Sequence, residues 1–236
     1  MSGEQGDAAL DAAPNAAADG AGAAADTPAP RTTYRHGDLR GALLAAGIEM
    51  ARRGGPDAVV LREATRQAGV TPNAAYRHFA DRQALLRAVS DAAQGLAADA
   101  MEAEVARAAA ASGVNTADAA RRMLRAVGTG YLAFARDEPG LFRAAFSVPD
   151  HLANSMDAAK AGTAGRTPFQ ILSAALDAWA AAGILPPARR ANAELYAWSA
   201  VHGLGMLVID GPLRGLSAEL VDGATVRVLD MVERGL

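Results

Sequence analysis

Residues 61–86 read LREATRQAGVTPNAAYRHFADRQALL, and this stretch decides the fold of the N-terminal part of the chain. Gly69 stands between two short helical segments, where a sharp turn favours a residue that tolerates positive φ. Thr71 can cap the second segment through its hydroxyl, and Pro72 fits the first helical position, which needs no N–H. Two short helices joined by a tight glycine turn predict a helix-turn-helix.

The second helix of this motif carries polar side chains that can reach a groove of DNA, and arginines lie around it. These residues are Asn73, Tyr76, Arg77, His78, Arg62, Arg66 and Arg82. Arginine suits backbone phosphates, so the pattern indicates a nucleic-acid partner. A structural interpretation stays open for several of them: Tyr76 and His78 as packing residues, and Arg66 and Arg77 as solvated surface.

Charge is distributed unevenly along the chain. Its 236 residues carry 23 basic and 26 acidic side chains, a net charge of −3. Residues 31–87 hold ten arginines against five acids, residues 1–30 hold five acids and no base, and residues 88–236 hold 13 bases against 16 acids. A basic segment joined to a mildly acidic body predicts an anionic partner for the basic segment.

Composition excludes several classes of protein. The absence of cysteine removes disulfides, thiolate metal sites and a cysteine nucleophile. No apolar run is long enough to cross a membrane, and the N-terminus lacks the basic and apolar blocks of a secretory signal. We therefore predict a cytoplasmic protein with no membrane partner.

The chain divides into three predicted parts. Residues 1–30 hold too little apolar surface to offset ordering entropy, which predicts a disordered tail. A helix-turn-helix domain is predicted over 31–87, and a larger helical domain for ligand binding and dimerisation over 88–236. The fold class is all-α, with helices expected at about 39–53, 61–68, 72–79, 81–111, 116–136, 139–146, 151–160, 168–182, 188–210 and 217–234.

The N-terminal part resembles the DNA-binding domain of TetR-type transcriptional regulators. The residues that carry the resemblance are Tyr34-x-His36-Gly37-Asp38-Leu39-Arg40, Leu61-Arg62-Glu63, Ala68-Gly69-Val70-Thr71 and Tyr76-Arg77-His78-Phe79-x-Asp81-Arg82-x-x-Leu85-Leu86. The resemblance implies a three-helix DNA-binding fold. It also implies that the major groove is met by Thr71, Pro72, Asn73 and Ala74. Backbone phosphates would be met by Arg62, Tyr76, His78 and Arg82.

Three positions depart from the pattern of the family. Val60 stands where a Ser or Thr usually caps the first short helix, and Thr65 stands where a small Ala lets the two helices approach. Ala74 has no polar side chain, so base reading is expected to fall on Thr71, Asn73 and apolar contacts with thymine methyls.

The C-terminal part is similar to a TetR subgroup named for a Trp-His-Gly signature. The matching order is Glu138-Pro139-Gly140-Leu141-Phe142-Arg143-x-x-Phe146-Ser147, Trp198-x-x-x-His202-Gly203-Leu204 and Asp210-Gly211-x-Leu213. Aromatic residues make up 5% of the chain and gather in residues 131–206, which favours a pocket. The predicted ligand-binding residues are Phe134, Phe142, Phe146, Trp179, Trp198, His202 and Met206. Ordinary core packing stays open for each of them.

Three classes of function compete for this sequence. An all-α enzyme is disfavoured because no metal-ligand cluster, Gly-rich phosphate loop or nucleophile–base pair appears. A helical adaptor that binds protein leaves the basic segment and its capped turn unexplained. We therefore predict a transcriptional repressor, without metal or cofactor, that a small apolar or aromatic effector releases from a palindromic operator.

A palindromic operator requires a homodimer, and the last two predicted helices offer the interface. One side of helix 188–210 is kept small, and helix 217–234 has an apolar stripe at spacings of three and four. The small residues are Ala197, Ala200, Gly203 and Gly205, and the stripe is Val221, Ala224, Val228 and Met231 or Val232. Packing of both helices onto their own core is the other interpretation.

Overall fold

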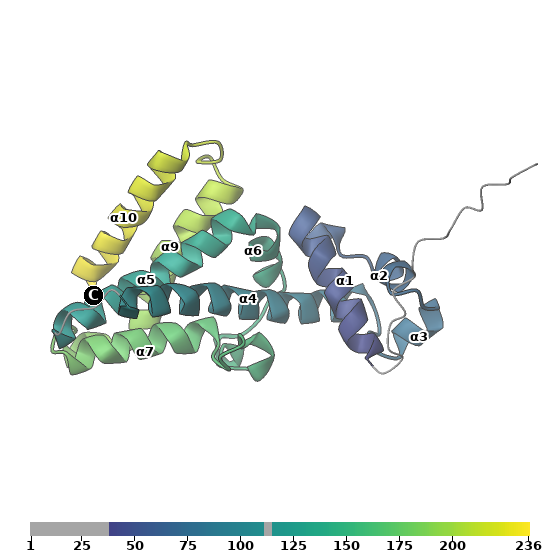
Figure 1. Ribbon diagram of the computed structural model, residues 1–236, viewed down its shortest axis with the longest axis horizontal. Coiled ribbons are helices and arrows are strands. Elements are labelled where there is room, and N and C mark those ends of the chain that lie inside the picture. Colours follow the sequence, from purple (N-terminus) through teal and green to yellow (C-terminus); the bar gives the residue numbers. More distant parts are fainter. Residues whose placement is uncertain (1–37, 111–114) are drawn as a thin grey trace, which may run out of the picture. The chain divides into compact units, whose positions relative to one another are not determined.

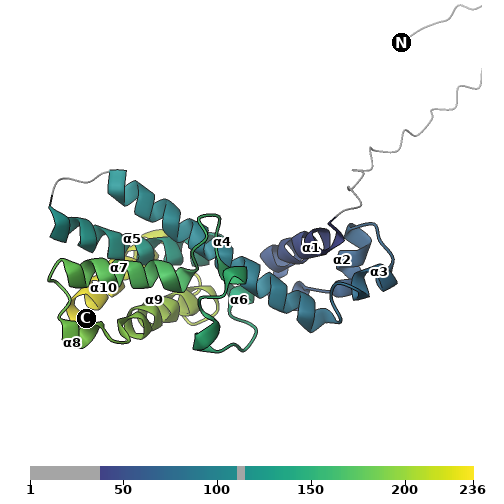
Figure 2. The ribbon, with the colours of Figure 1, turned by 90° about the horizontal axis from the view of Figure 1, so that it is seen from below.

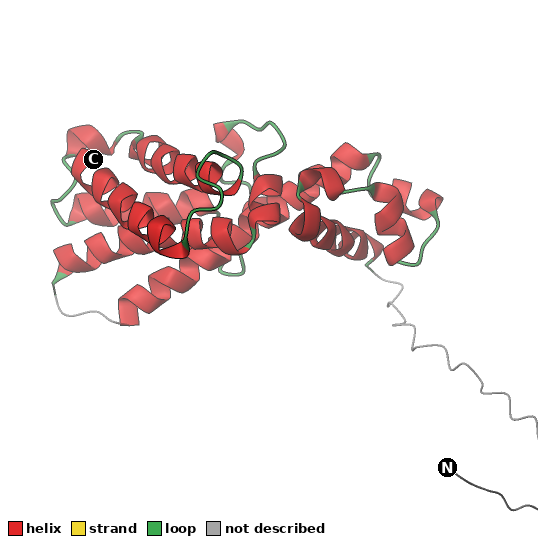
Figure 3. Ribbon diagram, turned by 90° about the horizontal axis from the view of Figure 1, so that it is seen from above, coloured by secondary structure: helices red, strands yellow, loops and turns green. Residues whose placement is uncertain are grey.

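The regular structure of the chain is helical, as predicted (Figure 3). The computed structural model describes residues 38–110 and 115–236. The predicted tail, residues 1–30, and the motif residues Tyr34, His36 and Gly37 lie outside the described residues.

Helices α1 to α3 form the predicted helix-turn-helix unit. Helix α1 spans Leu39–Gly54 and begins where the Asp38 carboxylate accepts the Gly41 N–H at 2.8 Å. After a short 3-10 turn, Pro56–Ala58, come α2 at Leu61–Gln67 and α3 at Pro72–Tyr76. Gly69 turns the chain between them at φ 67°, which confirms the glycine turn.

Two local predictions in this unit are wrong. The Thr71 side chain makes no capping hydrogen bond, because the first turn of α3 is closed by its backbone carbonyl instead, which accepts from Ala74 and Ala75. Helix α3 ends at Tyr76, short of the predicted residue 79. A turn follows, in which the Phe79 N–H bonds the Ala75 carbonyl oxygen and the Phe79 side chain is buried.

Helix α4 is the longest element of the described chain, at Arg82–Ala110 (Figures 1 and 2). The Asp81 carboxylate accepts the Ala84 N–H in its first turn. Buried residues recur every four positions, at Leu85, Val89, Ala93, Ala97 and Met101. The helix continues without a break across residue 87, where the domain boundary is predicted, so that both predicted domains share it; the boundary itself stays a prediction.

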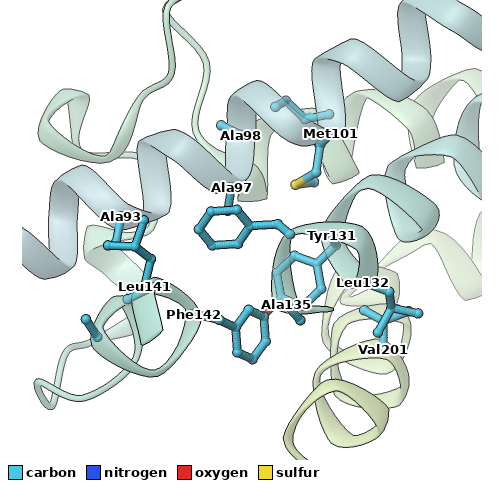
Figure 4. Close-up of a cluster of buried hydrophobic side chains, with 14 of the residues drawn as sticks. Ala93, Ala97, Ala98, Met101, Tyr131, Leu132, Ala135, Leu141, Phe142 and Val201 are labelled. Atoms are coloured by element: carbon cyan, nitrogen blue, oxygen red, sulfur yellow. The ribbon is translucent and has the colours of Figure 1, made fainter. Parts of the chain in front are cut away.

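The larger set of helices packs around the second half of α4. Helix α5, Thr116–Asp137, lies along α4, and α7, Pro168–Ala181, and α9, Ala193–Ile209, pack against α5. The short α6, Pro139–Ala145, contacts both α1 and α4, and α10, Ala218–Gly235, closes over α9 and α5. Figure 4 shows the buried side chains of Ala97, Met101, Tyr131 and Phe142 between these helices.

The helix predicted over 151–160 is wrong. The segment holds two 3-10 turns, Leu152–Asn154 and Ala158–Lys160. Asp150 and Asp157 explain this, because their carboxylates accept the nearby N–H groups of His151 and Ala159 and so compete with helical bonding.

The helix predicted over 188–210 is two helices. A single turn, α8 at Pro187–Arg190, is separated from α9 by Asn192, which lies at φ 60°. A left-handed residue cannot continue a right-handed helix. The break leaves Arg190 free to bond Asp177 and Glu194.

No helix within the described ranges combines the length and hydropathy that crossing a bilayer requires.

Gly130 makes the close contact of α5 with α4 possible, because an added Cβ would lie 2.6 Å from the Met101 Cα and 2.7 Å from the Ala100 carbonyl oxygen. We expect Gly130→Ala to lower the free energy of unfolding by about 1–3 kcal/mol, since backbone must move to admit the methyl group. Gly223→Ala is the control: it sits in α10 with open space around it and should gain up to about 1 kcal/mol from helix propensity. Urea unfolding measures both, and equal stability of the two variants would contradict the tight contact.

Candidate functional site

Helix α3 presents one polar face to solvent and is held by apolar residues on the other. Its exposed residues are Thr71, Pro72, Asn73, Tyr76 and, just beyond its end, Arg77 and His78. Ala75 and Phe79 are buried, and the Arg40 guanidinium lies 5.3 Å over the Phe79 ring. Tyr76 is 56% exposed, so the packing role left open for it does not apply. The exposed face of α3 is therefore free to enter a groove.

The arginines around α3 differ in what they bind. Arg62 is exposed, and its guanidinium has no hydrogen bond or ion pair within the described chain. Arg66 bonds Glu63, and this contact lowers the pKa of the Glu63 carboxyl to about 2. Arg82 donates to the carbonyl oxygens of Val59 and Pro56 at 2.8 and 2.7 Å. It thereby ties α4 to the loop before α2.

The departures from the family pattern are accommodated locally. Val60 gives α2 no side-chain cap, and the buried Thr65 satisfies its hydroxyl on the Arg62 carbonyl oxygen at 2.6 Å. Ala74 is half-buried, so Thr71, Pro72 and Asn73 are the more accessible of the residues expected at the major groove.

A cavity of about 490 Å³ lies between helices α4, α5, α7, α9 and α10 and the segment 145–160. This volume falls in the range of small-molecule sites. Most of its wall is apolar, including Met101, Leu124, Phe169 and Leu172. The cavity therefore has the size and the lining of a site for a compact apolar molecule.

One end of the cavity is built from stacked aromatic rings. Tyr131 lies edge-on to Phe142 at 5.3 Å between ring centroids, and the two lie side by side in Figure 4. The His202 ring stacks on Phe142 at 5.5 Å and meets Phe146 edge-on at 4.8 Å. Edge-to-face and stacked arrangements are those that aromatic pairs prefer, so these rings pack favourably against one another.

Three polar side chains at this end are joined by hydrogen bonds. The Trp198 Nε1–H donates to the Tyr131 hydroxyl at 3.1 Å, and that hydroxyl lies 2.9 Å from His202 Nδ1. Burial raises the pKa of Tyr131 and lowers the pKa of His202. Both groups are therefore neutral near pH 7.

The charged residues of the cavity wall are paired. Arg125 donates to Asp230 and Glu233 at 2.8 and 2.9 Å. Lys160 is buried and bonds Asp150 and the Asn154 carbonyl oxygen, which holds the pKa of Asp150 well below its usual value. Lys160 is not among the residues predicted from the sequence, although it stands out there as the single lysine beside 22 arginines.

The structure brings three of the seven predicted ligand-binding residues to the cavity wall: Phe146, Trp198 and His202. The other four, Phe134, Phe142, Trp179 and Met206, do not line it. Phe142 and Trp179 are fully enclosed in the core, Phe134 packs beside Phe142, and Met206 is half-buried against the core. Tyr131, which the prediction did not name, lines the cavity instead.

Comparison with known proteins agrees with this arrangement. Residues 43–89 match the family model described as bacterial regulatory proteins, tetR family. Residues 124–232 match the model described as tetracyclin repressor-like, C-terminal domain. Together the two models cover more than half of the chain. The chain belongs to the TetR family.

Solved structures of similar proteins share the fold of this TetR-family regulator. A protein of unknown function from Rhodococcus sp. RHA1 is 28% identical, with a TM-score of 0.61, over 87% of this chain and 99% of that one. A putative tetR family transcription regulator from Shewanella sp. PV-4 is 17% identical, with a TM-score of 0.52, over 82% and 97%. No curated protein sequence matches the chain.

The family gives the regulator its general activity. TetR-family proteins regulate transcription by binding DNA and are not enzymes. The Trp-His-Gly subgroup stays a prediction.

We predict that Arg82 stabilises the fold and that Arg62 contacts DNA. We expect Arg82→Met to lower the free energy of unfolding by about 1–3 kcal/mol, because two charge-assisted hydrogen bonds to backbone are lost. Arg62→Met should leave stability unchanged while weakening DNA binding. Thermal unfolding measures the stability of both variants, and titration with DNA measures their affinity. An Arg82→Met protein as stable as the parent would show that the bonds of Arg82 to the loop before α2 do not stabilise the fold.

Proposed function

We propose that this TetR-family regulator is a cytoplasmic repressor that a small apolar or aromatic effector releases from its operator. The single observation that carries the proposal is the position of α6, which contacts both the aromatic end of the cavity and helix α1. The description of the matched C-terminal model as tetracyclin repressor-like supports the sign of regulation.

DNA recognition is assigned to the exposed face of α3. Asn73 is exposed and offers an amide that pairs with adenine in the major groove. Tyr76, His78 and Arg62 are exposed around it and suit phosphate oxygens. Base contacts by Asn73 would therefore select the sequence, and the other three would position the helix.

Helix α6 supplies the proposed route from cavity to DNA. At one end, Gly140 lies so close to α1 that a Cβ would stand 2.3 Å from the Ala51 carbonyl oxygen. Arg52 of α1 also donates to Glu138, just before α6, at 3.0 Å. At the other end, Phe142 stacks on His202 and Phe146 lines the cavity. A ligand that displaces Phe146 would thus move a helix packed on α1.

The proposed interface with a second copy of the chain is formed by exposed apolar residues of α9 and α10. Tyr196, Leu207, Leu220 and Met231 are 68%, 43%, 59% and 59% exposed. Gly203 lies on the same side of α9 as Tyr196 and Leu207, with open space beside it for close approach. Ala197, Gly205 and Val232, predicted for this interface, are instead buried in the chain's own core. We propose that the interface uses the exposed residues of the two helices in place of these three.

The division of labour on α3 is tested with two variants on selected operator DNA. Tyr76→Phe should weaken binding on every sequence about equally, by roughly 0.5–1.5 kcal/mol, because one phosphate hydrogen bond is lost. Asn73→Ala should relax preference at one or two base pairs, by about 1–3 kcal/mol. Binding-site selection from random DNA distinguishes the patterns. A base-specific loss in Tyr76→Phe, or an unchanged consensus in Asn73→Ala, would contradict the assignment.

The dimer is tested with two methionines of equal exposure. Met231 of α10 is 59% exposed and Met156, on the segment between α6 and α7, is 60% exposed. Met231→Glu should give folded monomers that bind the operator weakly, because a charge would be buried in the seam. Met156→Glu should remain dimeric. Sedimentation equilibrium reports both, and a Met231→Glu dimer as tight as the parent would place the interface elsewhere.

A further inference from the structure

The hydroxyl of Tyr131 lies within hydrogen-bond distance of the His202 ring, at 2.9 Å from Nδ1. Tyr131 is buried, and the described chain gives its oxygen two partners, Trp198 Nε1 and His202 Nδ1. An indole N–H can only donate, so the hydroxyl accepts from Trp198. Its single proton then has one acceptor within reach, the Nδ1 of His202. We infer that the hydroxyl donates this proton to Nδ1, so that the neutral ring carries its own proton on Nε2.

The Nε2–H of His202 is left as an open donor at the cavity. It has no hydrogen-bond partner within the described residues. It is also absent from the side-chain atoms there that are buried without a partner, which belong to Arg122 and Trp179. Since His202 lines the cavity, this N–H is available to a molecule inside it. A donor set among apolar rings is the kind of group that orients a ligand.

The charged residues of the cavity wall, which are paired with one another, indicate the net charge of the ligand. Arg125 is bonded to Asp230 and Glu233, and Lys160 is bonded to Asp150. A charged ligand would compete with these pairs or enter an apolar space without a partner, and both are costly. A neutral molecule incurs neither cost.

We propose that the cavity binds a neutral aromatic molecule with a carbonyl oxygen, which accepts the Nε2–H of His202, and that Tyr131 is the positioning residue that keeps this proton in place. The inference rests on the proposed function in one respect, that the cavity is the effector site. Its chemistry can be tested without DNA.

The tautomer is read directly by NMR of nitrogen-labelled histidine in the full chain. We expect the protonated nitrogen of His202 to be Nε2 in the parent, and a mixture of the two tautomers in Tyr131→Phe. A parent ring protonated on Nδ1 would overturn the proposal before any ligand is added.

The ligand class is tested with three probes that share one ring system: 2-acetylnaphthalene, 2-isopropylnaphthalene and 2-naphthoate. Calorimetry on the parent should show 2-acetylnaphthalene binding about three- to tenfold more tightly than 2-isopropylnaphthalene, the worth of one hydrogen bond. The naphthoate should bind most weakly. Equal binding of the first two, tighter binding of the naphthoate, or no binding of any probe would each overturn the proposal.

His202→Phe gives the matched variant, because it keeps an aromatic ring and removes the donor. Its preference for 2-acetylnaphthalene should disappear while binding of 2-isopropylnaphthalene is kept, which also shows that the cavity is intact. A preference that survives would assign the donor to another group. If His202→Phe also loses binding of 2-isopropylnaphthalene, the Tyr131→Phe variant is used in its place. A partial loss of the preference for 2-acetylnaphthalene in Tyr131→Phe supports the proposal, and an unchanged preference contradicts the proposal.

Release of labelled operator DNA by 2-acetylnaphthalene separates this inference from the proposed function. Binding with the expected preference but without release leaves the ligand chemistry in place and rejects this compound class as the releasing effector. Release without the preference supports the proposed function and overturns the ligand chemistry.

Discussion

The contact of Gly140 with the end of α1 is the constraint on which the rest of the arrangement depends. An added Cβ would lie 2.3 Å from the Ala51 carbonyl oxygen and 2.4 Å from that of Arg52, so nothing larger than glycine fits without a shift of backbone. The contact fixes where α6 begins. The helix is seven residues long, so its start also fixes where Phe142 and Phe146 lie. Those two rings in turn bracket His202 at the end of the cavity.

The polar side chains at the aromatic end of the cavity are joined to one another by hydrogen bonds. Burial raises the pKa of Tyr131, whose hydroxyl accepts from Trp198 and, in the proposed tautomer, donates to His202. The charged residues of the wall are already paired. A hydrogen bond among apolar rings is costly to leave unmade, so the open donor of His202 can select among ligands of similar shape. This is the physical basis of the ligand class proposed for the cavity.

The sequence predicted what local chemistry decides. Gly69 at φ 67° and Pro72 at the first turn of α3 follow from residues within a short stretch, and both are predicted from it. The errors come from competition that a periodic pattern does not report. Asp150 and Asp157 bond backbone beside them and stop a helix, and Asn192 breaks another. The cavity was harder still, because Tyr131 and Lys160 reach it from elements far apart in sequence, while Trp179 and Phe142, equally aromatic, are enclosed in the core.

The coupling between the cavity and α1 through α6 limits how far a ligand can change the affinity for the operator. A ligand shifts an equilibrium between two states by its differential affinity for them and by no more. Coupling between sites in proteins is typically about 1–3 kcal/mol, a change of roughly 5- to 150-fold in affinity. The hydrogen bond to His202 can contribute to that difference only if it is stronger in one state. Phe142 stacks on His202 and belongs to the helix that contacts α1, so any movement of α6 changes the surroundings of the donor. Ligand selection and operator release would therefore depend on the same ring contact, and a ligand that leaves this contact unchanged would occupy the cavity without releasing DNA.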